Sequence, residues 1–271
     1  MTDLDTVAES RLVAQDLTVG YDGRVVIEGL DLRLRPGGIT SVIGPNGCGK
    51  STLLRTLGRL LAPQSGRVLL DGKEIARMRG RDVARTLGML PQTPVAPEGL
   101  TVGDLVAHGR HPHRSWLRQW SRDDEHEVTT ALERTGMAEL ADRPLEELSG
   151  GQRQRAWISM ALAQGTDILL LDEPTTYLDL AHSVDVLDLV HELQAGADRT
   201  VVMVLHDLNL AIRYSDELVV MHDGRIVAAG APADVIDAAL LQRVFGLRAE
   251  VTTCPVSGGP LVVPIGRRGN G

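Results

Sequence analysis

The sequence has little cysteine, no long apolar run and no excess of basic residues. Its 271 residues include two cysteines, Cys48 and Cys254, which give neither a disulfide framework nor the spacing of a metal site. Such low use of cysteine is typical of the cytoplasm. No apolar run approaches the roughly 18 residues that a membrane-spanning helix needs. The polar, acidic residues 1–10 are unlike a secretory signal. If the protein acts at a membrane, we expect another chain to cross it.

Basic residues are outnumbered, with 28 Lys and Arg against 36 Asp and Glu and a formal net charge of −8. Proteins that bind nucleic acid normally carry a basic face, so this balance predicts no nucleic-acid partner. A hydrophobic content of 43% and a charged content of 24% are ordinary for a soluble globular protein. The length is enough to bury a core in one large domain or two small ones.

One stretch, residues 44–52, has the spacing G-x-x-x-x-G-K-S of a phosphate-binding loop. The apolar residues 39–43 before it predict a buried strand. The leucines after it predict one apolar face of a helix: Leu53, Leu54, Leu57, Leu60 and Leu61. Glycine lets the backbone turn sharply and approach a triphosphate, and the helix N-terminus adds partial positive charge. The sequence therefore predicts a nucleoside triphosphate site, in preference to a glycine-rich turn with a chance lysine.

Two side chains of this loop have predicted chemical roles. Lys50 can reach the β- and γ-phosphates, and the Ser51 hydroxyl is placed to bind Mg²⁺. Cys48 is interpreted as a small side chain that the loop tolerates, the alternative being a thiol whose oxidation blocks the nucleotide. The predicted nucleotide contacts of the loop are Gly44, Pro45, Asn46, Gly47, Cys48, Gly49, Lys50, Ser51 and Thr52.

The remaining pattern predicts an α/β fold. Residues 11–36 indicate β-structure, because Leu30, Leu32 and Leu34 alternate with charged residues. Further strands are predicted at residues 67–70, 87–90, 168–171 and 201–205, and helices near residues 82–85, 152–164 and 180–194. Such alternation favours a mainly parallel sheet. Residues after 217 are predicted to return to β-structure, and residues 267–271 to fray.

The middle of the chain differs from this core because it is largely helical. Helix-start signals stand at Thr101 and Ser121, and Gly136 is a plausible helix stop. The sequence therefore predicts a P-loop NTPase core with a mainly parallel sheet, an antiparallel β-subdomain and an inserted α-helical subdomain.

Two further motifs turn a binding site into a catalytic one. Asp172 and Glu173 close a predicted strand, where adjacent side chains point to opposite faces. Alone, such a pair is usually a solvated turn, but beside a phosphate loop it suggests Asp172 for Mg²⁺ and Glu173 as general base. The second motif, which opens a helix with free N–H groups, is Ser149, Gly150, Gly151 and Gln152. The chain thus has one phosphate-seeking helix end more than its own triphosphate needs.

With these motifs in place, the sequence resembles the ATP-binding cassette (ABC) family, specifically the ATPase subunits of bacterial importers. The resemblance extends from about residue 12 to residue 264. It implies an ABC ATPase domain over residues 11–250, with a helical insert at about residues 97–160, and a C-terminal extension at residues 251–271. It also implies that the signature LSGGQ, residues 148–152, of one copy completes the ATP site of another in a head-to-tail dimer.

The resemblance assigns roles to residues that stand alone in the sequence. Gln92 matches the glutamine that contacts Mg²⁺ and water and relays to the membrane partner, and His206 matches the switch histidine at the γ-phosphate. Tyr21 matches the aromatic that stacks on adenine, although a tyrosine beside a strand is by itself more often packing. Asp179 matches the aspartate that communicates across the dimer, but the residues before it depart from the common Ser-Ala-Leu-Asp form.

In sum, the implied catalytic residues are Lys50, Gln92, Glu173 and His206. The implied magnesium ligands are Ser51, Gln92 and Asp172. Besides the loop, the implied nucleotide contacts are Tyr21, Ser149, Gly150, Gly151, Gln152 and Asp179. The implied cofactors are ATP and Mg²⁺.

Residues 109–113, 175–179 and 255–264 resemble the ATPases of ferric-siderophore and cobalamin importers. This implies ATP-driven uptake of a ferric siderophore at the cytoplasmic face of the cell membrane. The implied partners are a second copy on ATP binding, two copies of a permease and a binding protein outside the membrane. Alternatives are cobalamin, haem or metal-ion cargo, a non-transport ABC ATPase of DNA repair or translation, and a scaffold that binds ATP without hydrolysis.

Histidines and tryptophans near the middle of the chain admit two interpretations each. His108, His111 and His113 are interpreted as an ordinary loop, because an iron site would need supporting carboxylate or cysteine ligands. Trp116 and Trp120 stand one helical turn apart, which favours internal packing, with contact to the permease as the alternative.

Overall fold

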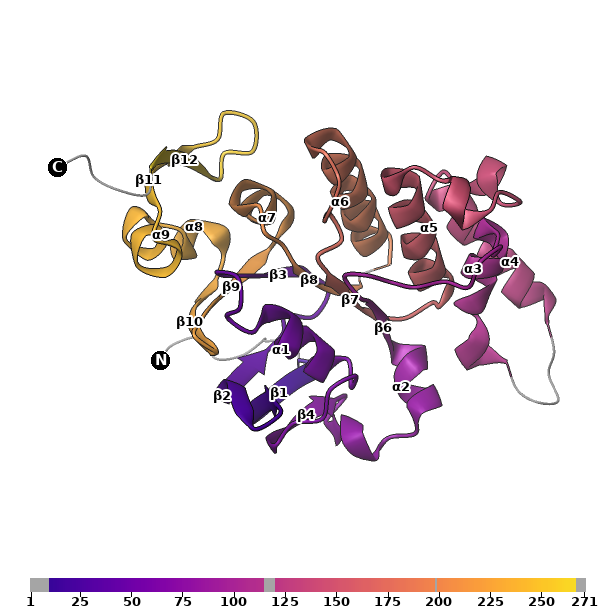
Figure 1. The fold of residues 1–271 in the computed structure, drawn as a ribbon, viewed down its shortest axis with the longest axis horizontal. Coiled ribbons are helices and arrows are strands. Elements are labelled where there is room, and N and C mark those ends of the chain that lie inside the picture. The colour runs from indigo at the N-terminus through magenta and orange to yellow at the C-terminus, as the bar shows by residue number, and fades with distance from the viewer. Residues whose placement is uncertain (1–9, 115–119, 198, 267–271) are drawn as a thin grey trace, which may run out of the picture. The chain divides into compact units, whose positions relative to one another are not determined.

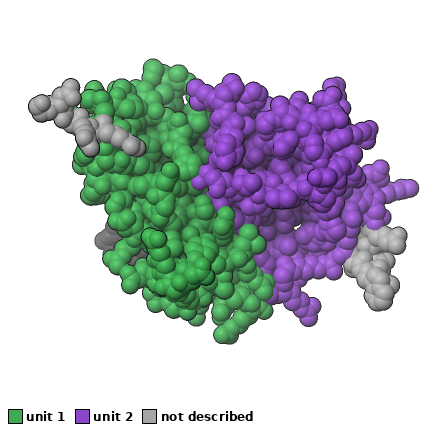
Figure 2. Space-filling view, viewed as in Figure 1, with its two compact units in different colours: residues 1–77, 200–271 green, residues 78–199 purple. Residues whose placement is uncertain are grey.

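The structure, a computed structural model, describes residues 10–114, 120–197 and 199–266. The chain divides into two compact units, residues 1–77 with 200–271 (unit 1) and residues 78–199 (unit 2), which Figure 2 colours separately. None of the helices within the described ranges is both long and apolar enough to cross a membrane. Unit 2 is inserted in the sequence of unit 1.

An antiparallel sheet in unit 1 confirms the β-structure predicted for residues 11–36. Its order is β2-β1-β4-β5, with β1 at Leu12–Tyr21, β2 at Arg24–Arg33, β4 at Ser65–Leu70 and β5 at Lys73–Glu74. Side chains alternate between the faces of a strand. As the alternation predicts, Leu30, Leu32 and Leu34 are buried while the charged residues between them are exposed.

A second group of strands in unit 1 is mainly parallel, as predicted. β3 (Ile39–Ile43) pairs in parallel with β8 (Thr200–Val204) and with β9 (Glu217–His222), and β10 (Arg225–Gly230) is antiparallel to β9. Every residue of β3 and β8 is buried. Strands covered on both faces lack polar alternation, which explains their nearly continuous apolar sequences.

The first helix of unit 1, α1 (Lys50–Leu57), follows the glycine-rich loop as predicted but is shorter than expected. Gly58 caps it, and Arg59 then takes a left-handed φ of 60°. Leu60 lies beyond the helix and is 65% exposed. The prediction that Leu60 and Leu61 continue its apolar face is therefore wrong, because the leucine spacing passes over the residues that end the helix.

The C-terminal part of unit 1 contains the predicted β-structure and, within the described residues, three helices that the sequence analysis did not predict. After α7 (Leu208–Tyr214), β9 and β10 come α8 (Pro232–Val235) and α9 (Ala238–Phe245). A hairpin of β11 (Arg248–Thr253) and β12 (Pro260–Gly266) follows, so most of the predicted extension is an ordered hairpin. The fraying predicted for residues 267–271 lies outside the described residues.

Unit 2 contains the predicted helical insert and two parallel strands. The strands are β6 (Leu87–Leu90) and β7 (Ile168–Asp172). The helices are α2 (Gly80–Thr86), α3 (Val102–His108), α4 (Arg122–Arg134), α5 (Gly150–Ala163) and α6 (Leu180–Ala195). Short 3-10 turns are η1 (Ile75–Arg77, in unit 1), η2 (His111–His113), η3 (Ala138–Leu140) and η4 (Leu145–Glu147). Figure 1 shows α3 and α4 beside α5, and they pack against it.

The helix starts predicted at Thr101 and Ser121 are confirmed. Each hydroxyl accepts the backbone N–H three residues later, at 3.1 Å for Thr101 and 3.2 Å for Ser121. The carboxylates of Asp104 and Asp124 reach back to complete two capping boxes. Capping boxes satisfy backbone donors that a helix cannot pair internally. Because all their residues lie within one turn, this local signal was sufficient to predict where the two helices begin.

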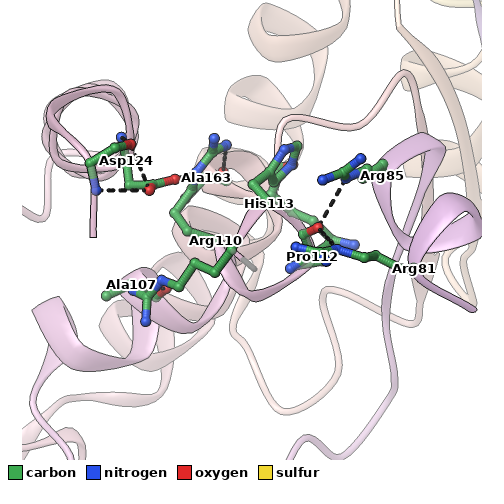
Figure 3. A network of polar contacts seen from close by, with 11 residues as sticks. Arg81, Arg85, Ala107, Arg110, Pro112, His113, Asp124 and Ala163 are labelled. Atoms are coloured by element: carbon green, nitrogen blue, oxygen red, sulfur yellow. Dashed lines mark hydrogen bonds and ion pairs between the residues drawn. The ribbon is translucent and has the colours of Figure 1, made fainter. Parts of the chain in front are cut away.

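A buried ion pair ties the helices of unit 2 together (Figure 3). Arg110, just before η2, donates from Nε to Asp124 Oδ1 at 2.9 Å and from a terminal nitrogen to the Ala163 carbonyl at 2.8 Å. Arg110 is 8% exposed and Asp124 is 5% exposed. Burial favours a raised pKa of Asp124, but hydrogen bonds from Ser121 and Arg110 outweigh it and lower that pKa to about 2. The pair therefore connects the starts of η2 and α4 with the end of α5.

Two of the three histidines at residues 108–113 are held by backbone carbonyls, and the ring of the third, His111, lies 5.0 Å from that of His108. His108 bonds the Asp104 carbonyl at 2.7 Å, and His113 bonds the Gln164 carbonyl at 2.8 Å. Trp120 is 44% exposed, with the Arg114 guanidinium 4.5 Å from its ring centroid, so its core packing is only partial. Trp116 lies outside the described residues.

We predict that Asp124→Asn lowers the free energy of unfolding by about 3–5 kcal/mol, because it leaves Arg110 buried without its counter-charge. Since the folded pKa of Asp124 is lowered from 3.8 to about 2, its stabilisation is present above the ordinary value and is lost as the pH falls through about 2. Urea unfolding at neutral pH measures the loss. Glu125→Gln, an exposed change on the same helix, is the control, and equal losses in both variants would contradict the assignment.

Candidate functional site

The glycine-rich loop of unit 1 has the geometry of a phosphate-binding loop. It leaves the end of β3, and α1 begins at Lys50. Gly44 and Gly49 have φ values of 154° and 105°, which a residue with a side chain rarely adopts. A Cβ on Gly44 would lie 2.2 Å from the carbonyl oxygen of Met221 in β9. Both glycines are therefore required, by conformation and, at Gly44, also by space.

Lys50 lies within this loop and is only 5% exposed. Its ammonium donates to the carbonyls of Gly44 at 2.9 Å and Pro45 at 3.0 Å. Both acceptors belong to the loop, so the positive charge is placed inside its curve. A compact ammonium there, with the backbone N–H groups at the start of α1, favours a polyanion such as a triphosphate.

Cys48 is a packed side chain of the loop. It is 5% exposed, and burial raises the pKa of its thiol, although the nearby Lys50 works in the opposite direction. A thiol is reactive mainly as the thiolate, so a raised pKa disfavours reaction. This supports the interpretation of Cys48 as a tolerated small side chain.

The remaining predicted residues of unit 1 lie at strand ends. β3 and β8 are parallel neighbours, with Val42 paired to Val204, so the phosphate loop and His206 follow the carboxyl ends of adjacent strands. That edge is where α/β sheets bind ligands. Tyr21 ends β1 and is 41% exposed, so packing does not fully occupy its ring.

In unit 2, a second pair of parallel strand ends brings Gln92 to Glu173. β6 and β7 pair up to Leu90 and Leu171, and Gln92 and Glu173 each stand two residues further along. The Gln92 amide nitrogen donates to Glu173 Oε2. A carboxylate can only accept, so the amide oxygen of Gln92 is the atom left to bind a metal or water.

The two carboxylates at the end of β7 are both largely buried, at 1% exposed for Asp172, its last residue, and 8% for Glu173, which follows it. Glu173 has a left-handed φ of 55° and also accepts a hydrogen bond from the Thr176 hydroxyl at 2.9 Å. Two buried carboxylates, of which Glu173 is held by two donors, are unlike a solvated turn, where acidic side chains stay exposed. The sequence interpretation of this pair as functional is thus supported.

The signature motif forms an exposed helix start. Ser149 caps α5, accepting from the Gln152 N–H at 3.3 Å, while the Gln152 side chain accepts from the Ser149 N–H at 3.1 Å. Ser149 and Gly150 are exposed at the N-terminus of this 14-residue helix. The arrangement leaves a positive helix end facing solvent.

Sequence reasoning missed His182, which links the signature helix to Asp179. Asp179 caps α6 and accepts from the His182 N–H at 2.9 Å and ring Nδ1 at 2.8 Å. These bonds hold the pKa of Asp179 below its ordinary value. The ring lies against Gly151, where a Cβ would be 2.7 Å from His182 Cδ2. A histidine at the third helical position after an aspartate cap was the available signal.

Comparison with known proteins decides the family. The sequence pattern of the family described as "ABC transporter" matches residues 27–176. The chain belongs to the ABC transporter family. It is an ATP-binding subunit, and ATP hydrolysis is the reaction of such subunits.

Individual relatives match over nearly the whole cassette. This chain is 54% identical to a Bacillus subtilis (strain 168) protein named "Probable siderophore transport system ATP-binding protein". The match extends over 258 residues, which are 95% of this chain and 94% of the relative. The chain is 49% identical over 262 residues, 97% of each chain, to the ferric enterobactin transport ATP-binding protein of Escherichia coli (strain K12). A solved subunit of a Clostridium perfringens ABC transporter complex matches with a TM-score of 0.75 and 30% identity, covering 84% of this chain and 90% of that one.

We predict that Gly151→Ala destabilises this ABC cassette by about 1–3 kcal/mol, because the added methyl meets the His182 ring. In a His182→Ala background the same change should cost little. Gly150→Ala is the matched control, since its Cβ would meet only Leu178 at 3.8 Å. Urea unfolding of the variants tests this, and an equal cost of Gly151→Ala in both backgrounds would rule out the steric explanation.

Proposed function

We propose that this ABC ATPase drives uptake of a ferric siderophore through a partner permease at the cytoplasmic face of the cell membrane. The observation that carries the cargo is the naming of relatives at 54% and 49% identity for siderophore and ferric enterobactin transport. The observation that carries the chemistry is the Gln92–Glu173 contact at the ends of adjacent strands. A binding protein outside the membrane would deliver the cargo to two copies of the permease.

Within the site, we assign each predicted residue a role toward ATP. The phosphate loop wraps the triphosphate, with Lys50 on the β- and γ-phosphates, Tyr21 stacks on adenine and His206 contacts the γ-phosphate. Glu173 accepts a proton from the attacking water as the oxygen–phosphorus bond forms and the bond to ADP breaks. Loss of such a base typically costs ~10²–10⁴ in rate.

The proposed magnesium ligands fit that ion by their chemistry. Ser51 offers a hydroxyl, Gln92 an amide oxygen and Asp172 a buried carboxylate, all oxygen donors of the kind that Mg²⁺ prefers. The orientation of the Gln92 amide, with its nitrogen on Glu173, leaves the oxygen for the metal. Magnesium, when bound, neutralises charge on the phosphate oxygens.

We propose that ATP joins two copies of the chain head to tail. The exposed N-terminus of α5 at Ser149 is a second anion-binding element that one triphosphate on its own loop does not require. Apolar side chains are also exposed beside Asp179: Tyr177 is 92% exposed and Leu180 is 68% exposed. Exposed apolar side chains next to functional residues are typical of a contact surface.

The rival functions have less support. A DNA-repair or translation ATPase would be expected to carry a basic face, whereas the net charge is −8. A non-hydrolysing scaffold would not need a Glu173 held by Gln92. Cobalamin, haem or metal ions remain the cargo alternatives that uptake measurements separate.

A strain that lacks this chain should no longer take up the ferric siderophore or grow on it as sole iron source. It should still grow on a soluble ferrous salt. Wild-type chain should restore uptake, whereas Lys50→Ala should not, because the phosphates lose their positive partner. The chain has one other lysine, the exposed Lys73, so Lys73→Ala is a matched control that should restore uptake. Measurement of labelled iron-chelate and cobalamin uptake decides the cargo. Normal uptake of every tested iron chelate in the deletion strain would refute the proposal that the cargo is a ferric siderophore.

A further inference from the structure

The proposed general base is held in an unusual backbone conformation. Glu173 has a left-handed φ of 55°, which is uncommon for a residue with a side chain. The chain then turns tightly, and the Thr176 N–H donates to the Glu173 carbonyl at 3.2 Å. This turn brings the side chain of Thr176 back to the carboxylate of Glu173.

Two donors from different parts of unit 2 bind the same oxygen of Glu173. The Thr176 hydroxyl donates to Oε2 at 2.9 Å, and the Gln92 amide donates to that oxygen as well. Gln92 lies 81 residues away in the sequence, whereas Thr176 lies three residues away on the same turn. Any movement of the segment after β6 shifts Gln92 relative to the base, but Thr176 moves with Glu173.

We propose that Thr176 is a positioning residue for hydrolysis, which rests on the proposed role of Glu173 as general base. Its hydroxyl fixes the rotation of the carboxylate, so that the oxygen that accepts the water proton keeps its direction when Gln92 changes contact. The Thr176 proton stays on its own oxygen throughout. A neutral hydroxyl suits this task, because its bond orients the carboxylate without placing a positive charge beside the base, as an Arg or Lys partner would.

The neighbouring Thr175 provides a natural comparison. It precedes Thr176 in the same turn and is likewise half-buried. The Thr176 hydroxyl is bonded to the Glu173 carboxylate, and Thr175 is its chemically identical neighbour in the turn. The two threonines therefore separate positioning of the base from a general need for threonine in the turn.

The test is steady-state ATP hydrolysis by the full chain assembled with its permease. Thr176→Val, which keeps the shape and removes the hydroxyl, should lower kcat by about 10–100-fold, because misplacement of a catalytic group can cost that much. The KM for ATP should change by less than about threefold, since the phosphate contacts remain. Thr176→Ser should restore kcat, and Thr175→Val should leave it near the wild-type value.

The same change in a Glu173→Gln background separates positioning from a structural role. If Thr176 acts through the carboxylate, Thr176→Val should have little further effect on the residual rate of Glu173→Gln. Thr176→Ala serves as a second variant if the valine perturbs folding, and thermal unfolding checks each protein. An unchanged kcat in well-folded Thr176→Val and Thr176→Ala, or an equal loss in both backgrounds, would overturn the proposal. Wild-type hydrolysis by Glu173→Gln would instead overturn the base assignment itself.

Discussion

The constraint on which the site depends is the burial of one positive charge in a loop of glycines. Lys50 is 5% exposed, and its ammonium donates hydrogen bonds to the Gly44 and Pro45 carbonyls, which carry partial negative charge. A buried cation is costly unless it is well paired, so this loop gains most from a polyanion. The positive φ of Gly44 and Gly49, the fully buried β3 and the start of α1 all serve to shape that loop.

Parallel strand pairing explains how distant residues come together within each unit. In unit 1, the phosphate loop and His206 follow the ends of β3 and β8, and in unit 2, Gln92 and Glu173 follow the ends of β6 and β7. The sequence separation between partners is large, but the geometry needs only that neighbouring strands end in register. The helical insert uses another device, because the buried Arg110–Asp124 pair joins the starts of η2 and α4 to the end of α5.

Local sequence signals predicted much of the fold. Features that depend on contacts between distant segments could not be predicted in this way. The starts of α3 and α4 were predictable because Thr101 and Ser121 complete their caps within four residues. The end of α1 was not, since leucine spacing carries no information on the turn at Arg59. The motifs supplied the candidate residues of the site, whose roles stay predictions. His182 and Thr176 were missed because each is recognised only by its hydrogen bond to a candidate residue, Asp179 or Glu173, and the folded chain is needed to see that bond.

The central claim is that each ATP site takes its phosphate loop from one copy and its signature helix from another. Mixing two inactive variants tests it directly. Lys50→Ala disables the loop, and Ser149→Arg obstructs the helix start. In a mixed dimer, one site combines the intact loop of the Ser149→Arg copy with the intact signature helix of the Lys50→Ala copy. The mixture should therefore hydrolyse ATP although neither variant does so alone. A control mixture of Lys50→Ala with the Lys50→Ala/Ser149→Arg double variant contains no intact loop and should stay inactive. A mixture no more active than the sum of its parts would contradict the shared site.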